Sequence, residues 1–92
     1  MTKAAHVLIE GRVQGVGYRD WAARTARAMG LRGWVRNRRD GAVEAVFSGE
    51  DGKVSDMLAR CRQGPRTAKV TDMRPLPDTP DVPLDFEIRA TI

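Results

Sequence analysis

The sequence is poor in the side chains that most often bind metals or cross-link a chain. Its 92 residues hold one cysteine, Cys61, and one histidine, His6. A single cysteine excludes a disulfide within the chain and a cysteine-rich zinc site, and a single histidine excludes a centre built on several imidazoles. We expect neither a metal ion nor another cofactor. Because a small domain without disulfides is typical of a reducing compartment, we expect a cytoplasmic protein.

Long apolar runs and aromatic residues are also scarce. No stretch approaches the roughly 18 apolar residues of a membrane span, and the N-terminal stretch reaches Glu10 and Arg12 without the apolar run of a secretory signal. Only 5% of the residues are aromatic, whereas small domains that bind RNA on a sheet need aromatic rings for base stacking. The net charge of +4 is modest, but it can attract small anions. We expect no membrane or nucleic-acid partner.

What is present is the composition and periodicity of one globular core. With 41% hydrophobic and 30% charged residues, residues 1–92 are expected to form a single domain. Apolar positions recur at helical spacing from Tyr18 to Met29 and from Val54 to Cys61. Strands are predicted over 6–13, 32–37, 43–47, 68–73 and 86–90. In the fourth of these, Ala68, Val70 and Asp72 are expected to share one face. Four prolines between residues 75 and 83 predict an extended connection to the last strand.

This order of elements predicts the fold class. Two helices, each with an apolar stripe on one side, must cover one face of a single sheet. With right-handed crossovers, the order βαββαβ gives a ferredoxin-like α+β sandwich. We expect an antiparallel sheet with two helices on one face and a short fifth strand at the C-terminus.

The first candidate site is GRVQGVGYR, residues 11–19. Gly15 and Gly17 allow backbone conformations in which successive N–H groups point into one concavity, and the free N–H groups of the following helix add to it. Arg19 lies in the first helical turn, where the helix dipole disfavours a cation, which suggests that its guanidinium helps to hold a phosphate. The alternative is a tight turn beside a solvated arginine. The segment is neither a Walker A loop nor a dinucleotide-binding motif.

The second candidate site is GWVRNRRDGAVE, residues 33–44. Asn37 ends a predicted strand just before the hairpin signal Asp40-Gly41. Its amide can both donate a hydrogen bond to a water molecule and accept one, although a role in the turn alone is the alternative. Nearby arginines form either a positive rim that steers anions or a solvated hairpin tip; they are Arg36, Arg38 and Arg39.

Two reactive side chains are interpreted as structural. His6 is expected to be a structural or exposed strand residue. Cys61 lies on the apolar stripe of the second predicted helix, so we expect it in the core. Arg66 follows Cys61 at one residue less than the spacing of the tyrosine phosphatase signature, and a cysteine inside a helix is misplaced for that chemistry.

The two candidate sites together resemble the acylphosphatase family. Its first signature, G-x-V-Q-G-V-x-[FY]-R, is fitted throughout by residues 11–19, with Tyr18 in the aromatic place. Its second, G-x-V-x-N-x-x-D-G-x-V-E, is fitted throughout by residues 33–44. Gly64-Pro65, with the residues that follow, is also similar to the family. The resemblance covers nearly the whole chain and is weakest in residues 75–92.

The resemblance implies metal-independent hydrolysis of the carboxyl–phosphate bond of small acyl phosphates. It assigns catalysis to Arg19 and Asn37, with Asn37 orienting the attacking water. It assigns phosphate binding to Arg19 and to the backbone of four residues, which are Gly15, Val16, Gly17 and Tyr18. The alternative is a module that binds phosphate or carbamoyl phosphate without turnover. A small-molecule substrate is the expected partner, and a monomer the expected state.

Overall fold

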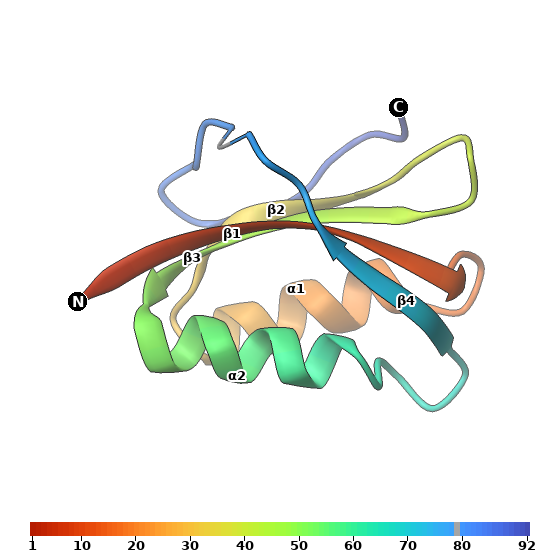
Figure 1. Cartoon of the computed structure of the whole chain (residues 1–92), viewed down its shortest axis with the longest axis horizontal. Coiled ribbons are helices and arrows are strands. Elements are labelled where there is room, and N and C mark those ends of the chain that lie inside the picture. The colour runs from red at the N-terminus through yellow and green to blue at the C-terminus, as the bar shows by residue number, and fades with distance from the viewer. Residues whose placement is uncertain (79) are drawn as a thin grey trace.

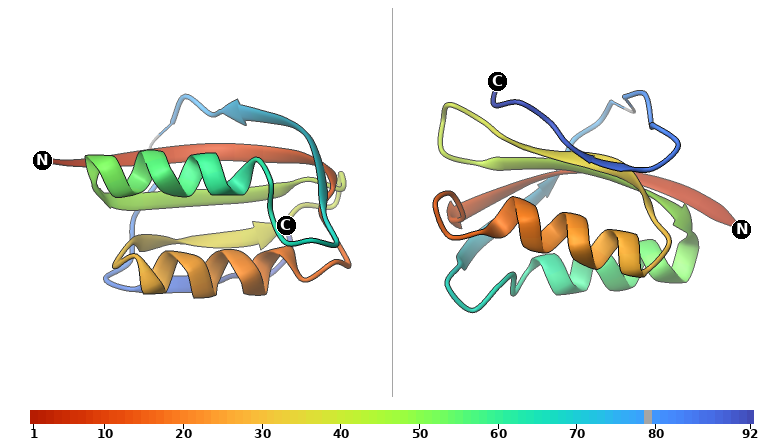
Figure 2. Two further views of the ribbon diagram at one scale, coloured as in Figure 1. Left: turned by 90° about the horizontal axis from the view of Figure 1, so that it is seen from below. Right: turned by 180° about the vertical axis from the view of Figure 1, so that it is seen from behind.

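The structure is a computed structural model that describes residues 1–78 and 80–92. The elements follow the predicted order and are β1 (Thr2–Arg12), α1 (Tyr18–Ala28), β2 (Arg32–Asn37), β3 (Val43–Glu50), α2 (Asp51–Cys61), β4 (Lys69–Pro75) and β5 (Phe86–Ile88). The strands form one sheet in the order β4-β1-β3-β2-β5. Both helices lie side by side on one face of it (Figures 1 and 2). The predicted ferredoxin-like fold is confirmed. None of the helices in the described residues is long and apolar enough to cross a membrane.

The hydrophobic core lies between the helices and the sheet. Helix α1 packs on β2 and β5, and α2 packs on β1 and β3. The face of α1 toward the sheet carries three fully buried alanines, Ala22, Ala23 and Ala26, whose small side chains let the helix backbone lie close to the strands. The predicted stripe of α2 is confirmed, because Val54 and Cys61 at its two ends are fully buried.

The fifth strand differs from the expected antiparallel sheet. Strand β5 pairs with β2 in parallel, with Gly33 opposite Phe86 and Val35 opposite Ile88. The other strand pairs are antiparallel. The reason is the route of the chain. Strand β4 runs toward the end of the sheet where β2 begins, and it ends at Pro75, opposite Val7 of β1. The connection therefore reaches β2 at that strand's first residues, and β5 starts there and runs in the same direction as β2.

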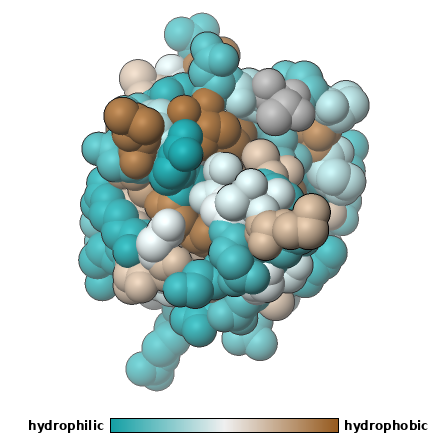
Figure 3. Space-filling view, turned by 90° about the vertical axis from the view of Figure 1, so that its left-hand side faces the viewer, coloured by the Kyte–Doolittle hydropathy of each residue, from teal (hydrophilic) through white to brown (hydrophobic). Residues whose placement is uncertain are grey.

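The connection between β4 and β5 covers the sheet face opposite the helices, as the crossing chain in Figure 1 shows. The Leu76 N–H donates to the His6 carbonyl at 2.8 Å, and Trp34 Nε1 donates to the Asp81 carbonyl at 3.4 Å. His6 and Trp34 are therefore buried, and of the two readings of His6 the structural one is correct. Figure 3 shows the end of the molecule at the N-terminus, where hydrophobic groups gather in the upper half and hydrophilic groups surround them.

Under this connection lies a group of paired polar side chains, which we call the Glu44 cluster: His6, Arg36 and Glu44. His6 Nε2 lies 2.6 Å from Glu44 Oε2, and Arg36 Nε lies 3.0 Å from Glu44 Oε1. His6 Nδ1 lies 3.1 Å from the Asp78 carbonyl oxygen. The Arg36 guanidinium also lies over the Trp34 ring, 4.6 Å from its centre. The cluster joins β1, β2, β3 and the covering connection.

A β-bulge changes the expected pattern of β4. Glu10 pairs with Asp72, but Gly11 pairs with Val70, so Thr71 is an extra residue on β4. The expectation that Asp72 shares the face of Val70 is therefore wrong. Met73, which follows the bulge, returns to the helix side and is buried there.

Candidate active site

The loop between β1 and α1 presents backbone N–H groups without partners. Gly15 and Gly17 have φ angles of 72° and 80°, a left-handed region that favours glycine. Gly17 caps α1 with no side-chain hydrogen bond. The N–H of Trp21, bonded to the Gly17 carbonyl at 3.0 Å, is the first in the helix with an acceptor. Within the described chain, the N–H groups of residues 15–20 donate no hydrogen bond. Such a helix start attracts anions.

Two long-range hydrogen bonds hold this loop in place. Thr67 Oγ1 donates to the Val16 carbonyl at 2.6 Å. The Tyr18 hydroxyl donates to the Cys61 carbonyl, also at 2.6 Å, from a side chain only 1% exposed. Burial raises the pKa of Tyr18 far above its usual range, so the phenol remains a donor. The Tyr18 side chain is an anchor between α1 and α2, and its backbone N–H remains free for a ligand.

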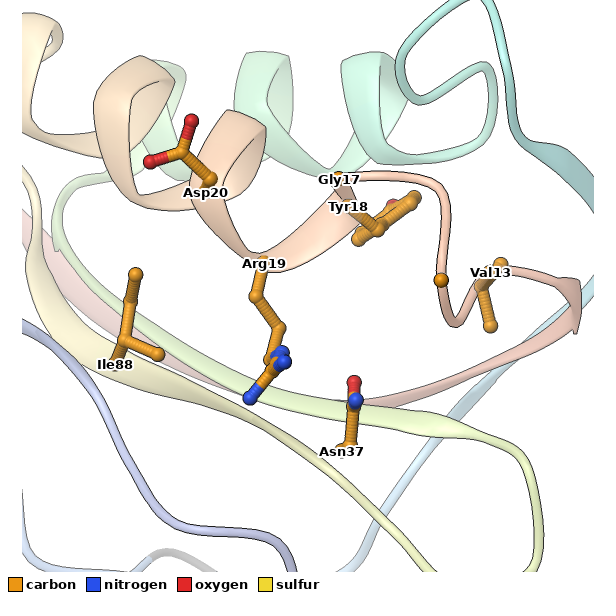
Figure 4. A pocket seen from close by; sticks show the side chains of 8 residues that line it. Val13, Gly17, Tyr18, Arg19, Asp20, Asn37 and Ile88 are labelled. Atoms are coloured by element: carbon orange, nitrogen blue, oxygen red, sulfur yellow. The ribbon is translucent and has the colours of Figure 1, made fainter.

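Arg19 points from the first turn of α1 across the pocket toward Asn37 (Figure 4). It is half-buried, yet within residues 1–78 and 80–92 its guanidinium makes no ion pair or hydrogen bond. The other half-buried arginines are each paired with a carboxylate, and they are Arg36, Arg38 and Arg89. The Arg19 guanidinium is therefore free to bind a ligand anion.

Asn37 is the last residue of β2 and lies opposite Val43 of β3. Its Oδ1 is buried and has no hydrogen-bond partner among the described residues. Leaving such an acceptor unsatisfied costs about 1–3 kcal/mol, so a water molecule or a ligand is the expected partner. As predicted, this strand ends just before a hairpin turn, in which Asp40 Oδ1 accepts from the Ala42 N–H at 3.0 Å.

Gln14 joins the loop to the hairpin and was not singled out from the sequence. Its Nε2 donates to the Arg38 carbonyl at 2.7 Å and to the Ala42 carbonyl at 2.8 Å. These two bonds hold the hairpin that carries Asn37 against the loop that leads into α1 and Arg19. The available signal is the position of Gln14 inside the first motif. Its acceptors lie 24 and 28 residues away, and no local pattern identifies them.

The loop, Arg19 and Asn37 line a half-open cavity of about 250 Å³. Its lining residues are Val13, Gly15, Gly17, Tyr18, Arg19, Asp20, Asn37 and Ile88. Five of the six residues expected at the site thus come together. The exception is Val16, which does not line this cavity and whose carbonyl is held from outside by Thr67. Sequence reasoning missed two residues of the wall, Asp20 and Ile88. Ile88 was missed because the position of β5 depends on its parallel pairing with β2.

The expected positive rim is only partly present. Arg36 lies on the opposite face of the sheet in the Glu44 cluster, because neighbouring strand residues face opposite ways. Arg38 is paired with Asp40 at 3.1 Å. Hydrogen bonding from the Ala42 N–H, with a smaller effect of Arg38, lowers the pKa of Asp40. Arg39 remains exposed.

Cys61 belongs to the core, as expected. Its side chain is fully buried, and burial raises the pKa of the thiol to about 12. A thiol with this pKa is protonated at neutral pH and is a poor nucleophile. In the part of the chain that the structure describes, no group of three or more histidine, cysteine or acidic residues could hold a metal ion.

The fold and the site together define a class of protein: a ferredoxin-like sandwich whose first helix begins at an uncapped glycine loop facing an arginine and an asparagine. A model of the acylphosphatase family matches residues 5–88. The chain therefore belongs to the acylphosphatase family.

Three relatives illustrate this similarity. An acylphosphatase of Rhodopseudomonas palustris is 67% identical over 64 residues, which cover 70% of this chain and 65% of that protein. Acylphosphatase 2 of Ralstonia nicotianae is 54% identical over 94% of this chain and 92% of its own length. The structure of an acylphosphatase from Coxiella burnetii superposes with a TM-score of 0.88 at 31% identity, covering 96% of this chain and 93% of that one.

Proposed function

We propose that the protein is an acylphosphatase that hydrolyses the carboxyl–phosphate bond of small acyl phosphates to a carboxylate and inorganic phosphate. The observation that carries this proposal is that Arg19 and Asn37 lie in one cavity beside free helix N–H groups. Neither side chain makes a hydrogen bond or an ion pair within the described residues. Support also comes from the relatives, which are named acylphosphatases.

The phosphate group would bind in the glycine loop. Its oxygens would accept hydrogen bonds from the free N–H groups of Gly15, Gly17 and Tyr18 in the cavity wall and from that of Val16 in the same loop, and the Arg19 guanidinium would bind two oxygens at once. Phosphoryl transfer requires mainly positioning and charge stabilisation, and donors already in place supply both without reorganisation.

The attacking water would be held by Asn37, whose unpaired Oδ1 would accept a hydrogen bond from it. The water oxygen forms a bond to phosphorus while the bond from phosphorus to the acyl oxygen breaks. The acyl oxygen leaves with the electron pair as a carboxylate, one proton of the water passes to a phosphate oxygen, and the other stays on the oxygen that is now bonded to phosphorus. A carboxylic acid has a pKa of roughly 4, so the leaving group departs without a general acid. The same stability of the leaving group supports a mechanism without a metal.

The test is the hydrolysis of benzoyl phosphate by the purified protein in excess chelator. Rapid turnover that resists the chelator is expected. We also expect the rate to stay flat from mildly acidic to neutral pH, because the proposed mechanism uses no side chain as a general acid or base. A folded protein that binds inorganic phosphate but hydrolyses no acyl phosphate would instead support the alternative, a phosphate-binding module.

We further infer that residues 1–92 act as a single cytoplasmic domain with a small-molecule substrate and with no nucleic-acid or membrane partner. A monomer is expected, and sedimentation of the purified protein would measure its mass.

A further inference from the structure

We propose that Asp20 and Ile88 form the acyl-binding part of the cavity and select short, uncharged acyl groups. This inference rests on the proposed function. Both residues line the cavity that contains Arg19 and Asn37. In Figure 4 they lie on one side of Arg19, whereas Val13 and Gly17 lie on the other. With the phosphate in the glycine loop, the acyl group would extend along the wall that Asp20 and Ile88 provide.

The size and the surface of this wall fit a short acyl group. Pockets that enclose drug-sized ligands measure about 300–1,000 Å³, whereas this cavity of about 250 Å³ must hold both the phosphate and the acyl group. Ile88 ends β5, is 44% exposed, and belongs to the few large apolar side chains that are exposed in the described chain. Its position at the cavity gives an apolar acyl group a surface to cover.

The charge of the wall would act against anionic acyl groups. Of the described residues that line the cavity, Asp20 is the only acidic one. Its carboxylate is 69% exposed and pairs with Arg24 at 3.0 Å. Arg24 lies one turn further along α1 and does not line the cavity, so of the two charges only that of Asp20 belongs to a residue of the cavity wall. A substrate with a second carboxylate, such as succinyl phosphate, would meet this charge.

The expected charge effect is modest and depends on salt. Two unit charges about 7 Å apart in a solvent-like dielectric change an equilibrium by about two- to threefold. Replacing Asp20 by Asn should therefore raise kcat/KM for succinyl phosphate relative to acetyl phosphate by about two- to threefold at low salt. The gain should disappear in 1 M salt, where the screening length is about 3 Å.

The expected apolar effect is larger. One methylene in a hydrophobic pocket changes specificity by about 10–200-fold, and the partial exposure of Ile88 places this site at the low end. Ile88→Ala should lower kcat/KM for benzoyl phosphate relative to acetyl phosphate by about tenfold. Ile88→Thr keeps the branched shape that suits a strand, and it should show the same direction if Ile88→Ala folds poorly.

The experiment measures kcat/KM for acetyl, benzoyl and succinyl phosphate with matched controls. Asp56→Asn is the control for charge, because Asp56 forms a similar exposed pair with Arg60 on α2, away from the cavity. Leu84→Ala is the control for the apolar side chain, since Leu84 is 90% exposed and lies outside the cavity. Neither control should change the ratios between the substrates.

Two results would overturn the inference while the proposed function stands. One is an unchanged ratio of succinyl to acetyl phosphate in Asp20→Asn at low salt. The other is an equal loss on acetyl and benzoyl phosphate in both Ile88 variants. If the wild-type protein hydrolyses none of the three substrates, the proposed function fails and this inference fails with it.

Discussion

Two polar clusters lie on opposite faces of β2 and β3, and they differ in whether their groups are paired. On the covered face, the Glu44 carboxylate binds both His6 and Arg36 at 2.6 and 3.0 Å. On the helix side, the next residue along β2 is Asn37, whose Oδ1 has no partner within the described residues, and Arg19 beside it has none either. The polar side chains on the covered face are thus paired with one another, whereas those on the helix side have no partner within the described residues.

The difference separates groups that hold the fold from groups that are free for a ligand. A polar group that is buried without a partner costs free energy, so the pocket is destabilising until something binds there. A group paired within the chain has already used its hydrogen-bonding capacity. We therefore expect substitutions in the pocket to change turnover and spare stability, and substitutions in the Glu44 cluster to do the reverse.

The largest effect on turnover is expected from Arg19→Ala. A transition-state arginine contributes about 10³–10⁵-fold to phosphoryl transfer, so kcat/KM should fall by at least about 10³-fold and phosphate inhibition should weaken. The melting temperature should not fall, because a cation in the first helical turn opposes the helix dipole. Arg19→Lys should recover little activity, since an ammonium cannot bind two phosphate oxygens as a planar fork does. A loss of stability that matched the loss of activity would contradict the contrast between the clusters.

Asn37→Ala should lower kcat by about 10²–10³-fold, the typical effect of removing one positioned polar group from an active site. Competitive inhibition by inorganic phosphate should change less than about twofold, because Arg19 and the loop remain. Stability should be retained, since the variant removes an acceptor that had no partner. Equal losses of turnover and of phosphate binding would instead assign Asn37 a structural role.

Gln14→Leu should lower kcat by about tenfold to a hundredfold, because a misplacement of about 1 Å can cost that much. Leucine cannot donate to the Arg38 and Ala42 carbonyls, so the hairpin would shift relative to the loop. If Gln14 acts through Asn37, the same substitution in the Asn37→Ala background should add little further loss. Gln63→Leu, at an exposed position after α2, is the matched control. Additive losses in the double variant would show that Gln14 does not act through Asn37.

Local patterns in the sequence predicted the parts of the fold and the site that depend on local physics. Helical spacing identified α1 and α2, and strand β2 has the predicted bounds. Local signals made Arg19 a candidate, as a cation in the first turn of a helix, and Asn37 a candidate, as the end of a strand before a turn. Their assignment to one site came from the resemblance of both motifs to the acylphosphatase family. Each of these signals lies within a few residues of the group that it identifies.

The features that were missed depend on contacts distant in sequence. The acceptors of Gln14 and the cavity wall at Ile88 follow from how the hairpin and β5 are placed. The β-bulge at Thr71 is a single inserted residue and leaves no periodic signal. The covering of His6 depends on the connection after β4, whose prolines have no apolar period to predict where it lies.

Glu44→Gln should have the smallest effect on turnover and a clear effect on stability. Burial alone would raise the pKa of Glu44, but hydrogen bonds from His6 and Arg36 outweigh it and lower this pKa in the folded protein. An unfolded glutamate has a pKa of about 4.3. The stabilisation is therefore complete above that value and is lost as the pH falls through the lower folded pKa.

Wild-type stability should thus decline with acid more steeply than that of Glu44→Gln. Near neutral pH the variant should be less stable by about 2 kcal/mol, the range of hydrogen bonds to a charged group, while kcat per folded molecule stays within about twofold. Urea unfolding from pH 3 to 7 measures the stability of each protein near neutral pH and its decline in acid, and a separate assay measures kcat. Glu87→Gln is the control, because the side chains of the Glu87–Arg89 pair are 44% and 38% exposed, and ion pairs open to solvent contribute less than about 1 kcal/mol. If Glu44→Gln lowered kcat as strongly as Asn37→Ala, the Glu44 cluster would be part of the active site and the two faces of the sheet would not be separable.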